Sequence, residues 1–132
     1  MDTDPKRETK AWREVKISRR FLNAFRGMYV FGKTSRHLYI PILIILAVIF
    51  LGFYLKVSNV EWMMLVFSIG FVIVSELFNT AIEIDIDLTS PEYHPFARDT
   101  KDVAAAAVVL SVITTMIIGL IVFLPKILVL CI

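Results

Sequence analysis

Apolar residues in this chain come in three long blocks that are separated by short polar segments. The blocks cover residues 38–55, 60–82 and 103–124, and each is close to the roughly 20 residues needed to cross a hydrocarbon core about 30 Å thick. The apolar residues within a block are continuous instead of confined to one helical face, as expected for helices surrounded by lipid. The pattern predicts three transmembrane helices in an all-α integral membrane protein.

The segment before the first block has a different pattern. Between residues 11 and 31, apolar and aromatic side chains recur at helical spacing with basic side chains between them. A basic, aromatic-rich amphipathic helix is typical of helices that lie in the membrane interface. We expect Gly32 to Arg36 to end this helix, and residues 1–10, which are charged and lack apolar periodicity, to be a flexible lead-in.

Composition and charge support this interpretation. The chain of 132 residues is 58% hydrophobic with a mean hydropathy of +0.75, above the roughly 45–50% apolar content of soluble domains. Of its 14 Lys and Arg residues, ten precede Leu38 and two lie in the segment 83–102. This asymmetry predicts a cytoplasmic N-terminus and 83–102 segment, and an external C-terminus. Basic residues next to apolar spans favour anionic lipid headgroups over nucleic acid as a partner.

Acidic residues occur at an unusual spacing toward the end of the second block. Glu76, Asn79, Glu83 and Asp87 follow one another at i, i+3, i+7 and i+11, with Thr80 beside them. At 100° per residue they share one helical face, which we call the polar stripe. Glu76 would lie about 6 Å, one turn, inside the apolar segment. An ionisable residue at that depth is costly and usually marks function.

The segment 83–102 adds further charge around the end of this helix. Thr89, Ser90 and Pro91 predict a helix end near Leu88, and Asp99 or Thr100 is expected to cap the third helix. A surplus of carboxylates favours a bound cation, and clusters of hard oxygen ligands suit Mg²⁺, often together with a phosphate.

Phosphoryl transfer requires the groups that this region contains: a metal, a cation for the phosphates, and a carboxylate that takes a proton from the attacking hydroxyl. Lys101 is a suitable cation. The chain has neither a GxxxxGK loop nor a protein-kinase signature. Two other interpretations stay open, a solvated charged loop and an ion-coupled membrane subunit, although ion relays usually reach the membrane midplane.

The stretch from Glu76 to Ala107 closely resembles the prokaryotic diacylglycerol kinase family of small membrane lipid kinases, which includes undecaprenol kinases. The matching pieces are ELFNTAIE, the Asp87 that follows, EYHPFARDTKD, and the run of small residues after it. They occur together and with the family's spacing. The strong part of the resemblance covers about a quarter of the chain.

The resemblance implies a homotrimeric enzyme of the bacterial inner membrane, with sites shared between subunits. It would transfer the γ-phosphate of MgATP to the hydroxyl of diacylglycerol or undecaprenol. Glu76 would be the general base and Glu83 a metal ligand, while Asn79 and Asp87 would support the site. The implied nucleotide-binding residues are Glu83, Glu92, Tyr93, His94, Lys101 and Asp102.

One position departs from the family pattern. The family usually has a second metal-binding Glu just before the first span, and Ser35 occupies that position here. A hydroxyl is a weaker Mg²⁺ ligand than a carboxylate, so a family member with weakened or absent catalysis is an alternative. The basic residue of the interfacial helix that would meet the nucleotide falls near Lys16.

Overall fold

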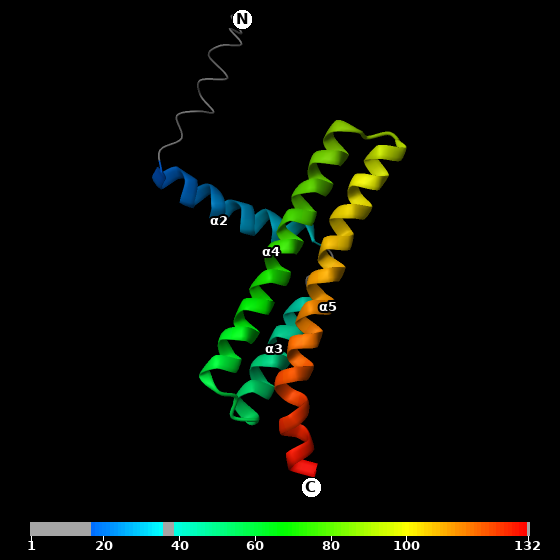
Figure 1. The fold of residues 1–132 in the computed structure, drawn as a ribbon. Helices are drawn as coiled ribbons and strands as arrows, with labels where there is room; N and C mark the ends of the chain where they lie inside the picture. Colours follow the sequence, from blue (N-terminus) through cyan, green and yellow to red (C-terminus); the bar gives the residue numbers. More distant parts are fainter. Residues whose placement is uncertain (1–16, 36–38, 132) are drawn as a thin grey trace, which may run out of the picture. The chain divides into compact units, whose positions relative to one another are not determined.

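The computed structural model describes residues 17–35 and 39–131, and in these ranges the chain forms only α-helices and turns. The all-α prediction is therefore confirmed for the described residues. The helices are α2 (Ile17–Thr34), α3 (Tyr39–Tyr54), α4 (Asn59–Thr89) and α5 (Pro95–Cys131) (Figure 1). The chain divides into two compact units, residues 1–35 and 36–132. The lead-in 1–10, the start of the interfacial helix and Lys16 lie outside the described residues.

Helix α2 of the first unit is amphipathic. Phe21, Phe25 and Met28 share one face at 100° per residue. A basic row of Arg19, Arg26 and Lys33, spaced by seven residues, follows the opposite face. This distribution is the one expected of an interfacial helix.

Helix α2 ends inside the segment from Gly32 to Arg36, where the sequence predicted its end. Helix α2 continues through Gly32 to Thr34, and the Ser35 N–H donates to the Phe31 carbonyl at 3.0 Å. A glycine costs a helix about 1 kcal/mol relative to alanine, but it keeps its backbone N–H and its hydrogen bond. Gly32 therefore weakens the helix without ending it.

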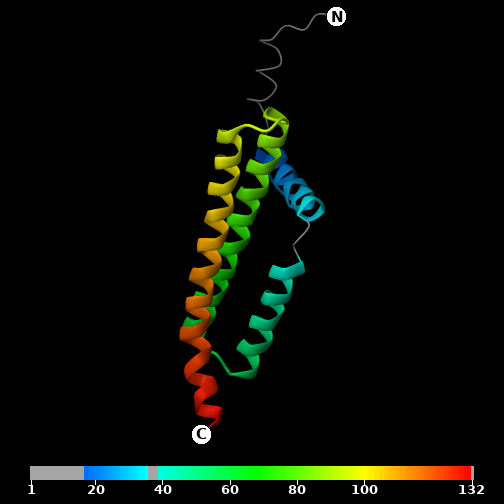
Figure 2. The ribbon, with the colours of Figure 1, turned by 90° about the vertical axis from the view of Figure 1, so that its right-hand side faces the viewer.

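Helices α4 and α5 of the second unit form a long antiparallel hairpin (Figures 1 and 2). Their 31 and 37 residues correspond to about 46 and 55 Å at 1.5 Å per residue, whereas the hydrocarbon core is about 30 Å thick. Both helices are long and apolar enough to cross a membrane, and both are longer than the crossing requires. The hairpin can therefore carry polar groups outside the hydrocarbon core.

Helix α3 is entirely apolar but shorter. Its 16 residues extend about 24 Å, which is less than the thickness of the core. Two of the three predicted spans are thus matched by long apolar helices in the described part of the chain, and the span at 38–55 stays a prediction.

The two ends of α5 differ from the sequence prediction. The helix begins at Pro95, and the His94 Nδ1 accepts a hydrogen bond from the Phe96 N–H at 3.3 Å, which caps the first turn. Proline suits this first position because it has no N–H to satisfy. Asp99 and Thr100, the expected caps, lie inside the helix, so that prediction was wrong.

Helix α5 continues through Pro125, beyond the predicted span 103–124, to Cys131. A proline inside a helix removes one backbone hydrogen bond and usually bends the helix. Here Val122 and Phe123 are buried just before it, and Lys126 just after it pairs with Glu61 of α4 at 3.1 Å. These contacts hold both sides of the proline in place.

All three helices of the second unit meet at the end that contains the 55–58 turn. The buried core there consists of Val57, Leu65, Val122 and Phe123. Gly52 lies so close to Trp62 that a Cβ on it would be 2.5 Å from the indole Cη2, and the Phe53 and Trp62 rings are 5.1 Å apart. Only a glycine allows this approach.

The 55–58 turn ends α3 with a Schellman motif. The Val57 N–H donates to the Gly52 carbonyl at 3.0 Å and the Lys56 N–H donates to the Phe53 carbonyl at 3.3 Å. Lys56 has a φ of 50°, the left-handed conformation that this motif requires and that glycine adopts at least cost.

Ser58 and Glu61 then start α4 with a capping box. The Ser58 N–H donates to the Glu61 Oε2 at 2.7 Å, and the Ser58 Oγ accepts from the Glu61 N–H at 3.4 Å. Since Glu61 also pairs with Lys126, the same carboxylate links α4 to α5. We call this end of the hairpin, with its core and its cap, the clasp.

Hydroxyl side chains connect α4 and α5 further along the hairpin. The Ser75 and Ser111 Oγ atoms are 2.8 Å apart, and the Thr115 Oγ1 donates to the Ser68 carbonyl at 3.1 Å. Ser68 and Ser111 are 1% and 0% exposed. Small hydroxyl residues let two helices approach and hydrogen-bond inside a membrane. We call these contacts the hydroxyl seam. They fix the rotation of α4 about its axis at Ser75, the residue before Glu76.

Replacing Lys56 with glycine should stabilise the second unit. A non-glycine residue pays about 1 kcal/mol for the left-handed conformation, and glycine adopts it freely, although part of the gain is lost to the entropy of the unfolded chain. We expect a higher thermal unfolding temperature for Lys56→Gly in detergent. A lower temperature would show that the Lys56 side chain stabilises the turn more than its conformation costs.

Replacing Ser111 with alanine should weaken α4–α5 packing by about 0.6–1.7 kcal/mol, the range for hydrogen bonds between membrane helices. Thr114→Val is the matched control, because within the described part of the chain the Thr114 hydroxyl bonds only to the Leu110 carbonyl of its own helix, at 2.9 Å. Denaturant unfolding of both variants would test this. Equal losses would mean that the bond between Ser75 and Ser111 contributes nothing specific.

Candidate functional site

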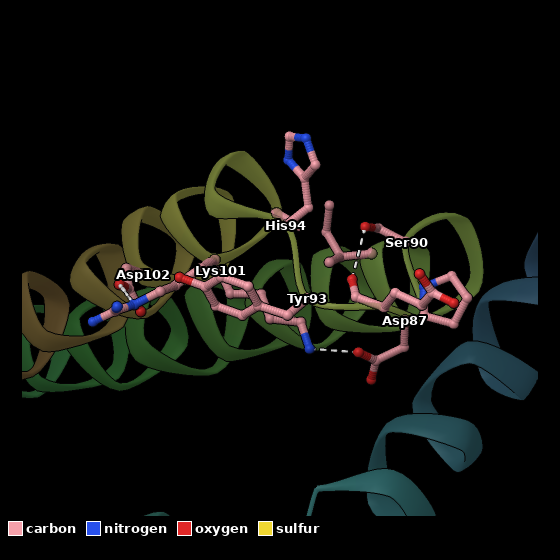
Figure 3. A pocket seen from close by; sticks show the side chains of 11 residues that line it. Asp87, Ser90, Tyr93, His94, Lys101 and Asp102 are labelled. Atoms are coloured by element: carbon pink, nitrogen blue, oxygen red, sulfur yellow. Dashed lines mark hydrogen bonds and ion pairs between the residues drawn. The ribbon is translucent and has the colours of Figure 1, made fainter.

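A pocket of about 270 Å³ lies at the end of the hairpin opposite the clasp. It is formed by the last turn of α4, the loop 90–94 and the first turns of α5 (Figure 3). Six residues selected from the sequence line it: Asp87, Glu92, Tyr93, His94, Lys101 and Asp102. The structure therefore brings most of the expected nucleotide-binding residues to one place.

Local backbone geometry explains why the chain turns here. Helix α4 ends at Thr89, one residue beyond the predicted Leu88, and the Ser90 N–H donates to the Ile86 carbonyl at 2.8 Å. The Ser90 Oγ donates to the Glu92 carbonyl at 3.3 Å. These two bonds hold the short loop that places the start of α5 beside the end of α4.

Two ion pairs form among the residues that line the pocket. The Lys101 ammonium pairs with the Asp87 carboxylate and so joins α5 to α4. The Arg98 Nε lies 3.5 Å from the Asp102 Oδ2 within α5, and both side chains are 67% exposed. Figure 3 shows both pairs as dashed lines. Both permanent cations of the pocket are therefore paired with carboxylates of the pocket.

The two rings of the loop point in different directions. Tyr93 extends along the side of the pocket that carries Lys101, and its side chain is well exposed, at 77%. His94 points away from Asp87 and Lys101 (Figure 3). Its Nδ1 accepts the bond that caps α5, and its ring lies 5.6 Å from that of Phe96.

The polar stripe lies on one unbroken helix, α4. Glu76 and Asn79 are half-buried, whereas Glu83 and Asp87 are exposed. Glu76, Asn79 and Glu83 do not line the pocket; they continue from it along α4 toward the seam. Glu76 and Glu83 are about 10 Å apart along the helix axis at 1.5 Å per residue.

Asn79 and Glu83 form a local pair within the stripe. The Asn79 Nδ2 donates to the Glu83 Oε1 at 3.2 Å, and the Asn79 Oδ1 is buried without a hydrogen-bond partner among the described residues. Buried polar atoms are nearly always paired, so an orphaned one points to a ligand that the chain itself does not supply.

The side-chain oxygens of the polar stripe suit Mg²⁺ only if phosphate oxygens supply further ligands to the ion. The described residues contain no group of three His, Cys, Asp or Glu side chains that could hold a metal. Mg²⁺ is commonly bound by one or two carboxylates together with substrate phosphates and water. Glu83, supported by Asn79, matches that mode. Ser35 lies in the first unit, and its position relative to Glu83 stays a prediction.

Arg98 was not among the site residues predicted from the sequence, although it lines the pocket beside Lys101. The available signal was its spacing, since Arg98, Lys101 and Asp102 stand at i, i+3 and i+4 on a helix. That signal depends on α5 starting at Pro95. With the helix expected to start at Asp99 or Thr100, Arg98 was treated as part of a loop.

Comparisons with known proteins agree with the resemblance. The prokaryotic diacylglycerol kinase family matches residues 22–123. The chain is 40% identical to the undecaprenol kinase of Bacillus subtilis over 106 residues, which are 80% of this chain and 86% of that protein. It is 36% identical to the diacylglycerol kinase of Pseudomonas aeruginosa over 71% of this chain and 72% of that protein.

A third relative matches a shorter region. The chain is 36% identical to a diacylglycerol kinase of Helicobacter pylori over 72 residues, which are 54% of this chain and 56% of that protein. The family match covers most of the chain and includes the polar stripe and the pocket. The chain therefore belongs to the prokaryotic diacylglycerol kinase family, a family of lipid kinases.

Proposed function

We propose that this membrane protein transfers the γ-phosphate of MgATP to the hydroxyl of a membrane lipid, diacylglycerol or undecaprenol. The observation that carries the proposal is the arrangement along α4. A half-buried carboxylate, Glu76, lies within the apolar part of the helix, and exposed carboxylates lead from it to a pocket that contains Lys101. One helix thus connects a position that lipid can reach with a position that a water-soluble nucleotide can reach.

Glu76 is the proposed general base. A carboxylate near the apolar segment can accept the proton of a lipid hydroxyl as its oxygen attacks the γ-phosphorus. The bond from that phosphorus to the β,γ-bridging oxygen breaks, ADP leaves, and the phosphorylated lipid keeps the new ester. The proton stays on the Glu76 carboxylate until water removes it.

The pocket is the proposed nucleotide site. Lys101 provides positive charge for phosphate oxygens, and Glu92, Tyr93, His94 and Asp102 offer polar contacts to the nucleotide. Glu83, with Asn79 and Asp87 on the same face, would hold Mg²⁺. The ion, when bound with ATP, supplies charge that neutralises the phosphates.

Undecaprenol is the first acceptor to test. The relative that shares 40% identity over 80% of this chain is named an undecaprenol kinase, while the two diacylglycerol kinases compared above match less of the chain.

For topology and assembly we propose what the sequence predicts. We place the N-terminus, α2 and the pocket at the cytoplasmic side of the bacterial inner membrane, α3 as a third span, and the C-terminus outside, in accord with the distribution of basic residues. We also infer a homotrimer with shared sites. Large apolar side chains of the hairpin such as Phe67, Phe78 and Leu110 are exposed in the single chain, so lipid or further copies must cover them.

A second candidate is a family member that binds nucleotide without turnover. Ser35 favours it, because a hydroxyl replaces the carboxylate that the family pattern places there. Direct assay of phosphate transfer separates the two candidates.

Replacing Glu76 with glutamine should lower phosphate transfer by about 10²–10⁴-fold, the usual contribution of a general base. The assay supplies labelled MgATP to purified protein in mixed micelles, with diacylglycerol and undecaprenol in separate tubes. Asp85→Asn is the matched control, because Asp85 is an exposed acid two residues from Glu83 and so on another face of α4. Near-normal activity of Glu76→Gln would remove Glu76 as the base.

Replacing Ser35 with glutamate should lower the Mg²⁺ concentration needed for half-maximal transfer, since a carboxylate binds Mg²⁺ better than a hydroxyl. Ser35→Gln controls for side-chain size without adding charge. An unchanged Mg²⁺ dependence in both variants would show that this position does not face the metal.

A further inference from the structure

Arg98 changes the charge balance of the pocket. The lining residues include three carboxylates, Asp87, Glu92 and Asp102, against two permanent cations, Arg98 and Lys101. Without Arg98, a single ammonium would face three carboxylates and an incoming polyphosphate. A pocket that binds an anion needs cations that can turn toward it.

We propose that Arg98 is a nucleotide-binding residue, whose guanidinium leaves Asp102 and contacts the phosphate oxygens of ATP. The inference rests on the proposed function and adds a residue to its nucleotide site. A guanidinium presents several N–H donors in a fixed plane and can bind two phosphate oxygens at once.

The existing ion pair of Arg98 is easy to break. The Arg98 Nε and the Asp102 Oδ2 are 3.5 Å apart, the residues are four positions apart on one helix, and both side chains are 67% exposed. Exposed pairs of this kind add little to stability. Arg98 can therefore exchange its partner at small cost, and the freed Asp102 carboxylate becomes an acceptor at the same ligand.

Position on the helix supports a phosphate as the new partner. Arg98 and Lys101 lie in the first two turns of α5, one turn apart. The positive end of the helix dipole is at that terminus and favours an anion there. The helix terminus thus adds to the attraction of the two side chains.

A phosphorylated lipid would offer Arg98 the same phosphate oxygens as the nucleotide does. The distance between the pocket and Glu76 favours the nucleotide. Lys101 pairs with Asp87, and Asp87 is about 16 Å from Glu76 along α4 at 1.5 Å per residue. The lipid hydroxyl must be at Glu76 during transfer, whereas the pocket lies at the hairpin tip.

The test measures steady-state kinetics and ADP binding of the full-length protein in mixed micelles. Arg98→Ala should raise the KM for ATP and the Kd for ADP by about tenfold, the effect of losing one charge-assisted hydrogen bond. Arg98→Lys should restore part of the affinity, because it keeps the charge but not the planar donors. The lipid KM should not change. Lys56→Gln, which removes a cation at the other end of the hairpin, should leave all these values unchanged.

The outcomes separate this inference from the proposed function. If the wild type phosphorylates lipid and Arg98→Ala leaves the ATP KM and the ADP Kd unchanged, the role of Arg98 is overturned and the kinase stands. A raised lipid KM alone would assign Arg98 to the acceptor lipid and would also overturn it. If the wild type phosphorylates neither lipid, the proposed function fails. The ADP Kd of Arg98→Ala, compared with that of the wild type, still tests whether Arg98 binds the nucleotide. Wild-type protein that binds no ADP would overturn the inference too.

Discussion

The packing of α4 against α5 is the constraint on which the proposed site depends. The pocket has walls from both helices, and Asp87, at the end of the polar stripe, lines it only for one rotation of α4 about its own axis. The contact of Ser75 with Ser111 sets that rotation, since hydroxyl groups inside an apolar pair of helices have few alternative partners. Each serine has one proton to donate, and each also lies near a carbonyl of its own helix, Val72 and Val108. The two hydroxyl protons therefore serve three possible hydrogen bonds, one between the serines and one from each serine to its own helix.

A lipid kinase must bring together two substrates with opposite solubility, and the proposed site offers a position for each. Glu76 is half-buried within an apolar helix, and Lys101 lies at a pocket beside an exposed loop. A soluble kinase can close a lid over both of its substrates, whereas a lipid hydroxyl stays near the membrane interface. An α4 longer than the hydrocarbon core resolves this difficulty, because the same helix passes from lipid into water.

Much of this arrangement could be predicted from the sequence. The apolar blocks and the spacing of the polar stripe indicated α4 directly, because both depend only on helical periodicity. The start of α5 could not be predicted in this way, since His94 is not a usual cap and the competing signal at Asp99 was stronger. The continuation of α5 through Pro125 could not be predicted locally either, because the ion pair of Lys126 just after the proline is with Glu61, far away in the chain. Arg98 was missed as a consequence of the first error.

Burial is distributed unevenly along the hairpin. The core of the clasp is buried, whereas no residue from 81 to 103 is buried. Segments with few buried apolar contacts open at the lowest free energy. The pocket end of the hairpin is therefore the end where local rearrangement costs least, within the limit set by the short loop 90–94. A proposed nucleotide site placed there can adjust to its ligand while the clasp and the hydroxyl seam stay packed.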